Sequence, residues 1–470
     1  MEHKSETDTD VDRVSPSGEK QENAVSWDPE EERKLVRKVD IRLFPTAWIM
    51  FLISWMDRSN LGNAKMAGLS HDLGLSSSDY SMSIIVFYFG YVVCAPLSNT
   101  LLVRTKPSIY LAGLMLLWGI STCGMAAIQT YPQLLVLRVF VGIFESGLAP
   151  AMYFMISSWF VPEEQAKRGA LFMSSAMLGG GFGGIIAGAV TDALEGKHGI
   201  RGWRWLFLVE GVITVGWALV AGYLLPDFPP TCHYITEHQR VIALRRLRNA
   251  GVEMEGKAWN RSDRIGIVKS VLLALSDWRT WAVSTGVTLS GCATVLPYFY
   301  PTLVTELGYK DRVKAQYMTV PIWAAAFICT LVTGVCADRI PGYRALFMAG
   351  WLIVGCALTA VVCNVYDHLA RYVVLIFQAG SVWSAITLGI ALETTTFKDM
   401  RPEVRAVAVS IPGALGNAGN IYGAYLFPAE HAPKYLMGFG VITGTLGGAA
   451  VIFAAIQVLL RKKQRQTESR

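Results

Sequence analysis

Twelve apolar runs, each about twenty residues long, limit what this chain can fold into. A helix rises about 1.5 Å per residue, so about 20 apolar residues are enough to cross the hydrocarbon core of a bilayer. Lipid offers no hydrogen-bond partners, so the backbone of such a run must satisfy itself within a helix. The runs lie at residues 43–63, 81–102, 108–128, 133–156, 169–191, 204–225, 280–303, 317–337, 345–365, 371–392, 405–427 and 435–460. The sequence therefore predicts an all-α membrane protein with twelve transmembrane helices.

A polar stretch at residues 227–279 divides these runs into two sets of six. We therefore expect a six-helix half at 41–226, a middle loop at 227–279 and a second six-helix half at 280–460. Two such halves are typical of secondary transporters. Residues 1–40 are polar and begin without an apolar segment, which predicts a disordered tail and no cleavable signal peptide. A second short tail is expected at 461–470.

Lys and Arg beside the apolar runs indicate the orientation, because they are enriched in cytoplasmic loops. Most of them fall on one side if both termini are cytoplasmic. These are Arg33, Lys34, Arg37, Lys38, Arg42, Arg104, Lys106, Lys167, Arg168, Arg240, Arg245, Arg246, Arg248, Arg261, Arg264, Lys269, Arg461, Lys462, Lys463 and Arg465. The opposite loops hold fewer, namely Lys65, Lys197, Arg201, Lys310, Arg312, Lys314, Arg371 and Lys434. We therefore expect both tails and the middle loop to be cytoplasmic.

The middle loop contains the start signal of a helix. Thr236 is followed three residues later by Gln239, the spacing of a capping box, and the basic segment Val241–Leu247 comes next. We expect a short basic helix that lies along the lipid headgroups, with binding to a partner protein as the alternative.

Two opposite charges interrupt the fourth apolar run. Arg138 and Glu145 are seven residues apart, so they share one face of a helix and lie about 10 Å apart along its axis. A charge at the centre of a membrane helix costs roughly 2.5–3.5 kcal/mol, so neither side chain is expected to face lipid. The first run supplies partners in Asp57 and Arg58. We expect these four charges to form the working site, with an ion pair that only holds helices together as the alternative.

Several other classes of function lack their sequence signatures. The eight Cys residues include no C-x-x-C pair, so neither a metal site nor a disulfide framework is expected. The sequence has no Walker loop and no motif of a catalytic nucleophile, so we predict no enzyme or ATP-driven pump, no catalytic residues and no cofactor. The net charge of +6 is too small to indicate nucleic acid. A transporter-like nutrient sensor is less favoured, because the tails leave little room for signalling.

Several motifs, taken together and in order, carry a family resemblance. They are Met56-Asp57-Arg58-Ser59-Asn60-Leu61-Gly62-Asn63-Ala64, the block from Arg138 to Glu145, Gly202-Trp203-Arg204-Trp205-Leu206-Phe207-Leu208-Val209-Glu210-Gly211, Gly334-x-x-x-Asp338-Arg339, Asn417-Ala418-Gly419-Asn420-Ile421 and Ala432-Pro433-Lys434-Tyr435. With them the chain resembles the major facilitator superfamily and, within it, the fungal allantoate permease group of the anion:cation symporter branch. The resemblance implies transport of carboxylate solutes, such as ureide acids, nicotinate, pantothenate or biotin, together with protons.

The resemblance also implies roles for single residues. It places proton-responsive acids at Asp57 and Glu145, a substrate-facing guanidinium at Arg58, and at Arg138 the cation that pairs with these acids. Arg58 would offer a carboxylate a bidentate fork that Lys could not reproduce. Glu210 is expected to form a structural pair near the outer end of the sixth run. Residues that could line a cavity from both halves are Asn60, Tyr88, Tyr91, Gln378, Trp383, Asn417 and Asn420, with packing as the alternative for the aromatic ones.

We therefore expect a monomeric secondary transporter of the plasma membrane that imports a small organic anion with protons by alternating access. It should contact membrane lipid and no nucleic acid. Export of an acidic metabolite through the same site is the alternative, because sequence does not decide direction.

Overall fold

The computed structural model describes residues 28–250, 265–306, 318–365, 367–397, 399–428, 431 and 434–468. Some features named above lie outside these residues. They are most of the N-terminal tail, the end of the C-terminal tail, the basic residues Arg261, Arg264, Lys310, Arg312 and Lys314, and Ala432-Pro433 of the last motif. Every regular element among the described residues is helical, which confirms the predicted all-α fold class.

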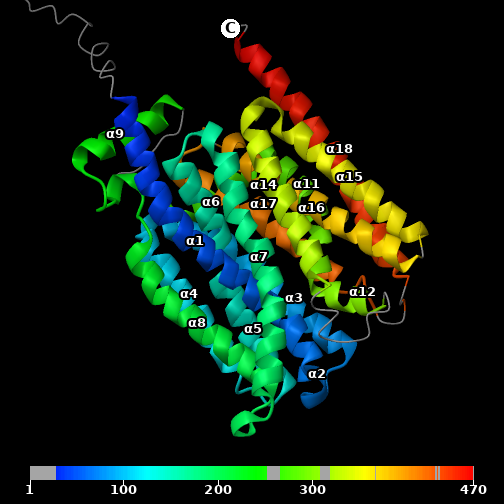
Figure 1. Ribbon diagram of the computed structural model, residues 1–470. Coiled ribbons are helices and arrows are strands. Elements are labelled where there is room, and N and C mark those ends of the chain that lie inside the picture. Colours follow the sequence, from blue (N-terminus) through cyan, green and yellow to red (C-terminus); the bar gives the residue numbers. More distant parts are fainter. Residues whose placement is uncertain are drawn as a thin grey trace, which may run out of the picture.

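The helices of the first half follow the predicted runs (Figure 1). They are α1 (Pro29–Met66), α2 (Leu69–Asp72), α3 (Ser77–Arg104), α4 (Pro107–Met125), α5 (Tyr131–Glu145), α6 (Leu148–Trp159), α7 (Pro162–Leu194) and α8 (Gly202–Leu224). Local signals explain several starts: Asp28 caps α1, Ser76 and Asp79 form a capping box at α3, and a Pro lies in the first turn of α4, α5 and α7. α1 packs on α7 and α8, α3 on α5, and α4 on α8.

The second half repeats this bundle of long helices after two shorter ones (Figure 1). The elements are α9 (Glu237–Asn249), α10 (Ile267–Ser276), α11 (Trp278–Gly291), α12 (Tyr300–Glu306), α14 (Val320–Arg339), α15 (Arg344–Asn364), α16 (His368–Thr396), α17 (Pro402–Gly423) and α18 (Leu436–Glu468). α15 packs on α16 and α18, while α11 packs on α17 and α18.

Among the described residues, ten stretches of helix are long and apolar enough to cross a membrane. They coincide with ten of the twelve predicted runs, and α5 and α6 together form one of them. The seventh run is helical but divided, because α11 ends at Gly291 and the 3-10 helix η3 (Cys292–Tyr298), which contains Pro297, leads to α12. The eleventh run is α17, which is more polar because it contains Ser410, Asn417 and Asn420 in addition to Glu403 and Arg405. Helical segments therefore occupy all twelve predicted positions.

The two halves meet along α3 and α17, and along α7 and α14. Ser81 near the start of α3 donates to the carbonyl of Ala424 just after α17, at 3.2 Å. Asn99 near the end of α3 donates to the carbonyl of Ala406 near the start of α17, at 3.0 Å. The two helices therefore run antiparallel and are held together near both ends, with the space between the halves lying between these contacts.

The predicted start of a helix in the middle loop is confirmed at α9. The Thr236 hydroxyl accepts the N–H of Gln239 at 3.3 Å, as in a capping box. Further along α9, the guanidinium of Arg246 contacts Glu32 of α1 at 2.5 Å and also pairs with Glu164 of α7. The helix is therefore bound to the first half of its own chain through part of its basic surface.

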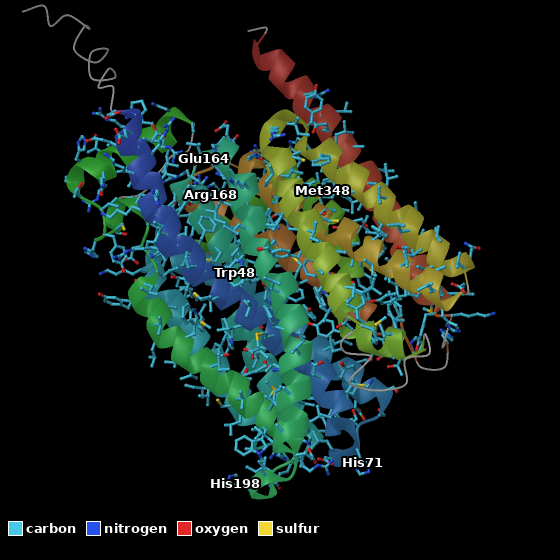
Figure 2. All side chains as sticks on the ribbon, viewed as in Figure 1. Trp48, His71, Glu164, Arg168, His198 and Met348 are labelled. Atoms are coloured by element: carbon cyan, nitrogen blue, oxygen red, sulfur yellow. The ribbon has the colours of Figure 1, made fainter. Side chains whose placement is uncertain are left out.

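The flanks that were predicted to share a side of the membrane lie at one end of the molecule. Figure 2 shows Glu164 and Arg168, at the start of α7, at the end opposite to His71 and His198. Arg168 pairs with Asp40 of α1 at 2.8 Å, so the starts of α1 and α7 are joined there. The C-terminus of α18 lies at the same end (Figure 1).

Candidate functional site

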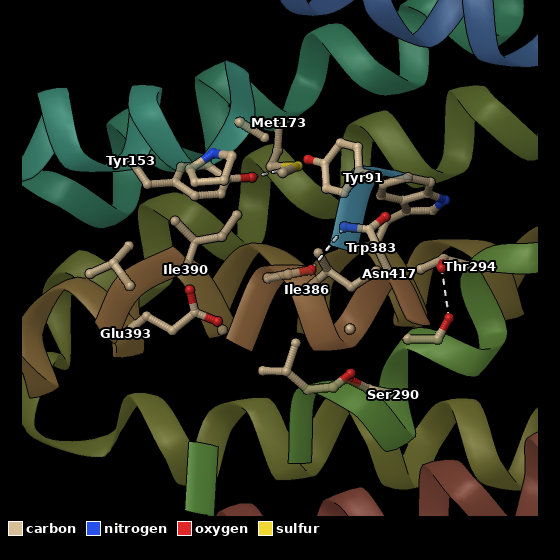
Figure 3. Close-up of a pocket in the computed structure, with 18 of the residues that line it drawn as sticks. Tyr91, Tyr153, Met173, Ser290, Thr294, Trp383, Ile386, Ile390, Glu393 and Asn417 are labelled. Carbon is tan, nitrogen blue, oxygen red and sulfur yellow. Dashed lines mark hydrogen bonds between the residues drawn. The ribbon is translucent and has the colours of Figure 1, made fainter. Parts of the chain in front are cut away.

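A cavity of about 120 Å³ lies between the two halves (Figure 3). Its walls come from α1, α3, α6 and α7 on one side and from α11, α15, α16 and α17 on the other. Most of the lining is apolar or aromatic, with Trp55, Tyr88, Tyr91, Tyr153 and Trp383 as the large rings. Arg58 and Glu393 are the charged side chains among its lining residues.

Aromatic contacts join the two halves around this cavity. The ring of Trp55 on α1 lies 5.0 Å from the ring of Trp383 on α16, at 73°. The hydroxyls of Tyr88 on α3 and Tyr298 in η3 share a hydrogen bond of 2.7 Å. Such walls can hold a flat or apolar body while leaving its polar ends to be bound by specific groups.

Arg58 forms a buried ion pair on the cavity wall. Its Nε donates to Oε1 of Glu145 at 2.5 Å, and the Ser54 hydroxyl, one turn earlier on α1, donates to the same oxygen. The guanidinium also lies 5.0 Å from the ring centre of Tyr91 and 5.3 Å from that of Trp55. Within the described residues, Nη2 of Arg58 and Oε2 of Glu145 have no hydrogen-bond partner. Among the residues that the structure describes, the pair therefore has one donor nitrogen and one acceptor oxygen that remain available for further hydrogen bonds.

Among the described residues, Arg138 forms no ion pair with the acids that it was expected to pair with. Glu145 contacts Arg58 instead, and Nε and Nη2 of Arg138 have no hydrogen-bond partner among the described residues. The reason is distance: seven residues along one helix separate the two side chains by about 10 Å, whereas α1 brings Arg58 directly against Glu145. Arg138 lies within electrostatic range of the hydroxyls of Tyr80 and Tyr298 and also of the carboxyls of Glu145 and Asp57.

Gly142 explains how α5 carries Glu145 to this place. A Cβ at position 142 would lie 2.1 Å from the carbonyl oxygen of Phe87 on α3, so only glycine permits the close approach. The two helices therefore touch backbone to backbone one turn before Glu145.

Asp57 lies in the core of the first half, outside the residues that line the cavity. Its Oδ2 accepts the Trp118 indole N–H at 2.8 Å and the Thr214 hydroxyl at 3.3 Å. Its carboxyl also lies within hydrogen-bonding distance of the carboxyl of Glu210 on α8. Asp57 Oδ1 and Glu210 Oε1 have no donor among the described residues. A proton shared between the two carboxyls would satisfy both oxygens and remove the repulsion of two buried charges.

Asn60 was expected to bind substrate, but it points into the same core. Its amide nitrogen donates to Oε2 of Glu210, and it is not among the cavity-lining residues. Glu210, which was expected to form a structural pair, therefore has Asn60 as a hydrogen-bond partner and Asp57 as a second neighbour. The reason is rotation: residue 58 on α1 faces the cavity, while residues 57 and 60 face α4 and α8.

The other expected cavity residues divide into two groups. Tyr88, Tyr91, Trp383 and Asn417 line the cavity, and the Asn417 amide also donates to the carbonyl of Gly413 at 2.8 Å. Gln378 and Asn420 do not line it. The Asn420 amide donates to the Thr294 hydroxyl at 2.9 Å, so it acts on the cavity through a lining residue. Gln378 is buried, and neither of its amide atoms has a partner in the described part of the chain.

Sequence reasoning missed two lining residues that bear on the chemistry, Tyr153 and Glu393. Glu393 is 3% exposed and follows directly after the predicted tenth run, 371–392. In the sequence, an acid directly after an apolar run is interpreted as the polar end of a membrane helix. The signal that could have found it is the continuation of α16 to Thr396, beyond the apolar run.

Comparison with known proteins gives consistent results. The sequence model of the Major Facilitator Superfamily matches residues 47–424. The chain is 34% identical to the MFS transporter prlL of Fungal sp. (strain NRRL 50135), over 93% of this chain and 88% of that protein. It is 28% identical to the high-affinity nicotinic acid transporter of Saccharomyces cerevisiae, over 92% of this chain and 78% of that protein.

Solved structures agree on the fold. The chain is similar to the proton:xylose symporter XylE, with a TM-score of 0.65 over 91% of this chain and 96% of that one. The two sequences are 14% identical, so the likeness concerns the arrangement of helices.

Proposed function

The chain belongs to the major facilitator superfamily, and from this premise we propose that it imports a small organic anion together with protons. Membership makes the chain a multi-pass membrane transporter and not an enzyme. We place it in the allantoate permease group of the anion:cation symporters, on the motifs around Asp57, Arg138, Trp203 and Asn417. The similarity to a nicotinic acid transporter supports a carboxylate as the solute.

The observation that carries the anion proposal is the incomplete pairing of Arg58. The residue is 4% exposed and lines the cavity, and its Nη2 lacks a partner among the described residues. Burying a guanidinium costs several kcal/mol, which one contact with Glu145 offsets only in part. A carboxylate in the cavity would accept from the free edge of the guanidinium, and charge-assisted pairs of this kind are strong. A neutral apolar solute would leave that donor unsatisfied.

Proton coupling follows if Arg58 is shared between Glu145 and the solute. An ionised Glu145 competes with a substrate carboxylate for the same guanidinium, and protonation of Glu145 weakens its hold on Arg58. Proton and anion would then favour the same conformational state, which is the thermodynamic condition for coupling. This arrangement replaces the expected Arg138–Glu145 pair with a contact that the solute can reach.

Asp57 is the second proposed proton site, with Glu210 as its partner. Two carboxyls in contact inside an apolar core favour holding one proton between them. Loss of that proton would leave adjacent negative charges on α1 and α8, and the two helices would then favour separation. Asp57 therefore responds to protons without touching the solute.

We further propose a monomer in the plasma membrane with both termini and the segment 227–279 cytoplasmic. The basic residues at the start of α1 and in α9 support this orientation. Tags at both termini and near Gly251 should be protected from a membrane-impermeant reagent in intact cells. Labelling of the middle loop from outside would overturn the orientation.

The function is tested by comparing metabolites in cells and medium with and without the protein. We expect a carboxylate to accumulate in cells that express the protein. When this carboxylate is added to proteoliposomes that contain the protein, protons should enter with it, as reported by a pH-sensitive dye trapped inside. Depletion from cells would show export, and a solute without an anionic group would overturn the proposal.

A further inference from the structure

The cavity has a second polar end at Glu393, near the last turn of α16. Figure 3 shows this side chain beside Ile390, on the same side of the cavity as Tyr153. It is 3% exposed and lines the cavity. None of the described residues donates a hydrogen bond to its carboxyl or forms an ion pair with it. Glu393 is thus a buried acceptor that nothing in the described protein satisfies.

Arg58 and Glu393 lie toward opposite ends of the cavity. Trp383 packs on Trp55, whose ring lies 5.3 Å from the Arg58 guanidinium, so Arg58 is level with Trp383. Glu393 follows Trp383 by ten residues of the same helix, which is about 15 Å along its axis. Tyr153 lies within electrostatic range of both charges. The lining in between is apolar, with Ile386 and Ile390 on α16 and Met173 on α7.

An unpaired carboxylate in such an apolar space is costly unless a donor or a proton reaches it. Arg58 cannot serve, because it lies toward the other end of the cavity, about 15 Å away along α16. A cationic or N–H group of a bound solute would serve, and it would gain a charge-assisted hydrogen bond in return.

We propose that Glu393 binds a hydrogen-bond donor of the transported solute, and that the cavity takes an extended acid with an amine or other N–H group remote from its carboxylate. This inference rests on the proposed function, because Arg58 is taken to hold the carboxylate. A compact acid would reach Arg58 alone. An extended acid without a donor would leave Glu393 without a hydrogen-bond partner. The cavity should therefore bind extended acids that carry a donor remote from the carboxylate more tightly than those that do not.

The test uses two probes that differ only at that end, octanoate and ω-aminooctanoate. Their binding to the purified full-length protein in lipid nanodiscs is measured by isothermal titration calorimetry. We expect the wild-type protein to bind ω-aminooctanoate about tenfold more tightly than octanoate, as one charge-assisted hydrogen bond allows. Glu393→Gln should remove this preference by weakening ω-aminooctanoate binding without weakening octanoate binding, while Glu393→Asp should keep part of it.

Glu403→Gln is the matched control, because Glu403 is a buried acid of α17 that does not line the cavity. It should keep the preference, and size-exclusion profiles should show that all variants fold. Equal binding of the two probes by the wild type, or a preference that survives Glu393→Gln, would overturn the inference. If Glu393→Gln keeps the preference but loses the pH dependence of octanoate binding, Glu393 is a proton site and not a binding site for the solute. If neither probe binds, the anion site at Arg58 is absent, and the proposed function fails first.

Discussion

The two halves of this transporter carry their buried charge in different ways. In the first half, Asp57, Arg58, Arg138, Glu145 and Glu210 lie within α1, α5 and α8, each 4% exposed or less. Four of them contact one another, as an ion pair and as a pair of carboxyls. The second half also buries charged side chains, namely Arg344, Arg371, Glu393, Glu403 and Arg405. Of these, Glu393 lines the cavity, with one aromatic ring, two hydroxyls and one amide from the same half.

This difference indicates that the two halves have different roles in transport. Charges that contact each other can change partners when a proton arrives, so the first half is suited to respond to protons and to the charge of the solute. Among its described lining residues, the second half has no two charges in contact, but it can fit the body of a solute and bind the far end at Glu393. A substitution in one half should therefore alter the function assigned to that half and leave the function of the other half unchanged.

The largest effect is expected from Glu145→Gln, which mimics the protonated acid permanently. Arg58 would then lose its ionic partner, and the competition between Glu145 and the solute would end. We expect accumulation against a gradient to fall to the level without a proton gradient, while counterflow of solute continues. Reconstituted vesicles allow both to be measured side by side. Full proton-driven uptake by this variant would remove Glu145 from the coupling mechanism.

Arg58→Lys should lower the affinity for the anion by about ten- to hundredfold, because a point charge replaces a planar fork and a loss of about 1.5–3 kcal/mol is typical. Arg138→Lys is the matched control, since Arg138 is equally buried and does not line the cavity. Its effect on affinity should be much smaller. Binding measured by calorimetry on folded protein decides this, and equal losses in the two variants would contradict the role of Arg58 as the anion clamp.

Glu210→Gln should change the response to pH and leave the affinity for solute nearly constant. Gln can donate to Asp57 without a shared proton, so the acid pair would behave as if protonated at every pH. We expect uptake to vary several-fold less between acidic and neutral medium than in the wild type. Thr214→Val, which removes one hydrogen bond to Asp57 and no charge, is the control. An unaltered pH profile in Glu210→Gln would show that the acid pair is structural.

The smallest effect is expected from Asn417→Ala in the second half. One neutral hydrogen bond is worth about 0.5–1.5 kcal/mol, so affinity should fall by about two- to tenfold. The ratio of protons to solute should not change, because Asn417 carries no charge and contacts none of the acids of the first half. A changed ratio, measured from proton and solute fluxes in the same vesicles, would break the division between the halves.

Sequence patterns predicted the places of the helices well but not the course of each one. The division of the fourth run at Ser146 and Gly147 and of the seventh run at Gly291 escaped the pattern, because both segments stay apolar through the break. Two of the predicted cavity residues, Asn60 and Asn420, proved to bind other side chains instead. The sequence pattern predicts that a polar residue within a membrane helix faces away from lipid. It does not predict which residue in the interior becomes its hydrogen-bond partner.

The sequence by itself determined that this chain crosses a membrane with paired six-helix halves and that its intramembrane charges face inward. Both conclusions depend on the solvent, because lipid penalises every exposed backbone group and every unpaired charge wherever the helix lies. Only the tertiary structure decided that Glu145 binds Arg58, that Asp57 meets Glu210, and that Glu393 enters the cavity. These contacts depend on the relative height and rotation of neighbouring helices. Those are set by close approaches such as Gly142 against Phe87, which the pattern of a single helix does not contain.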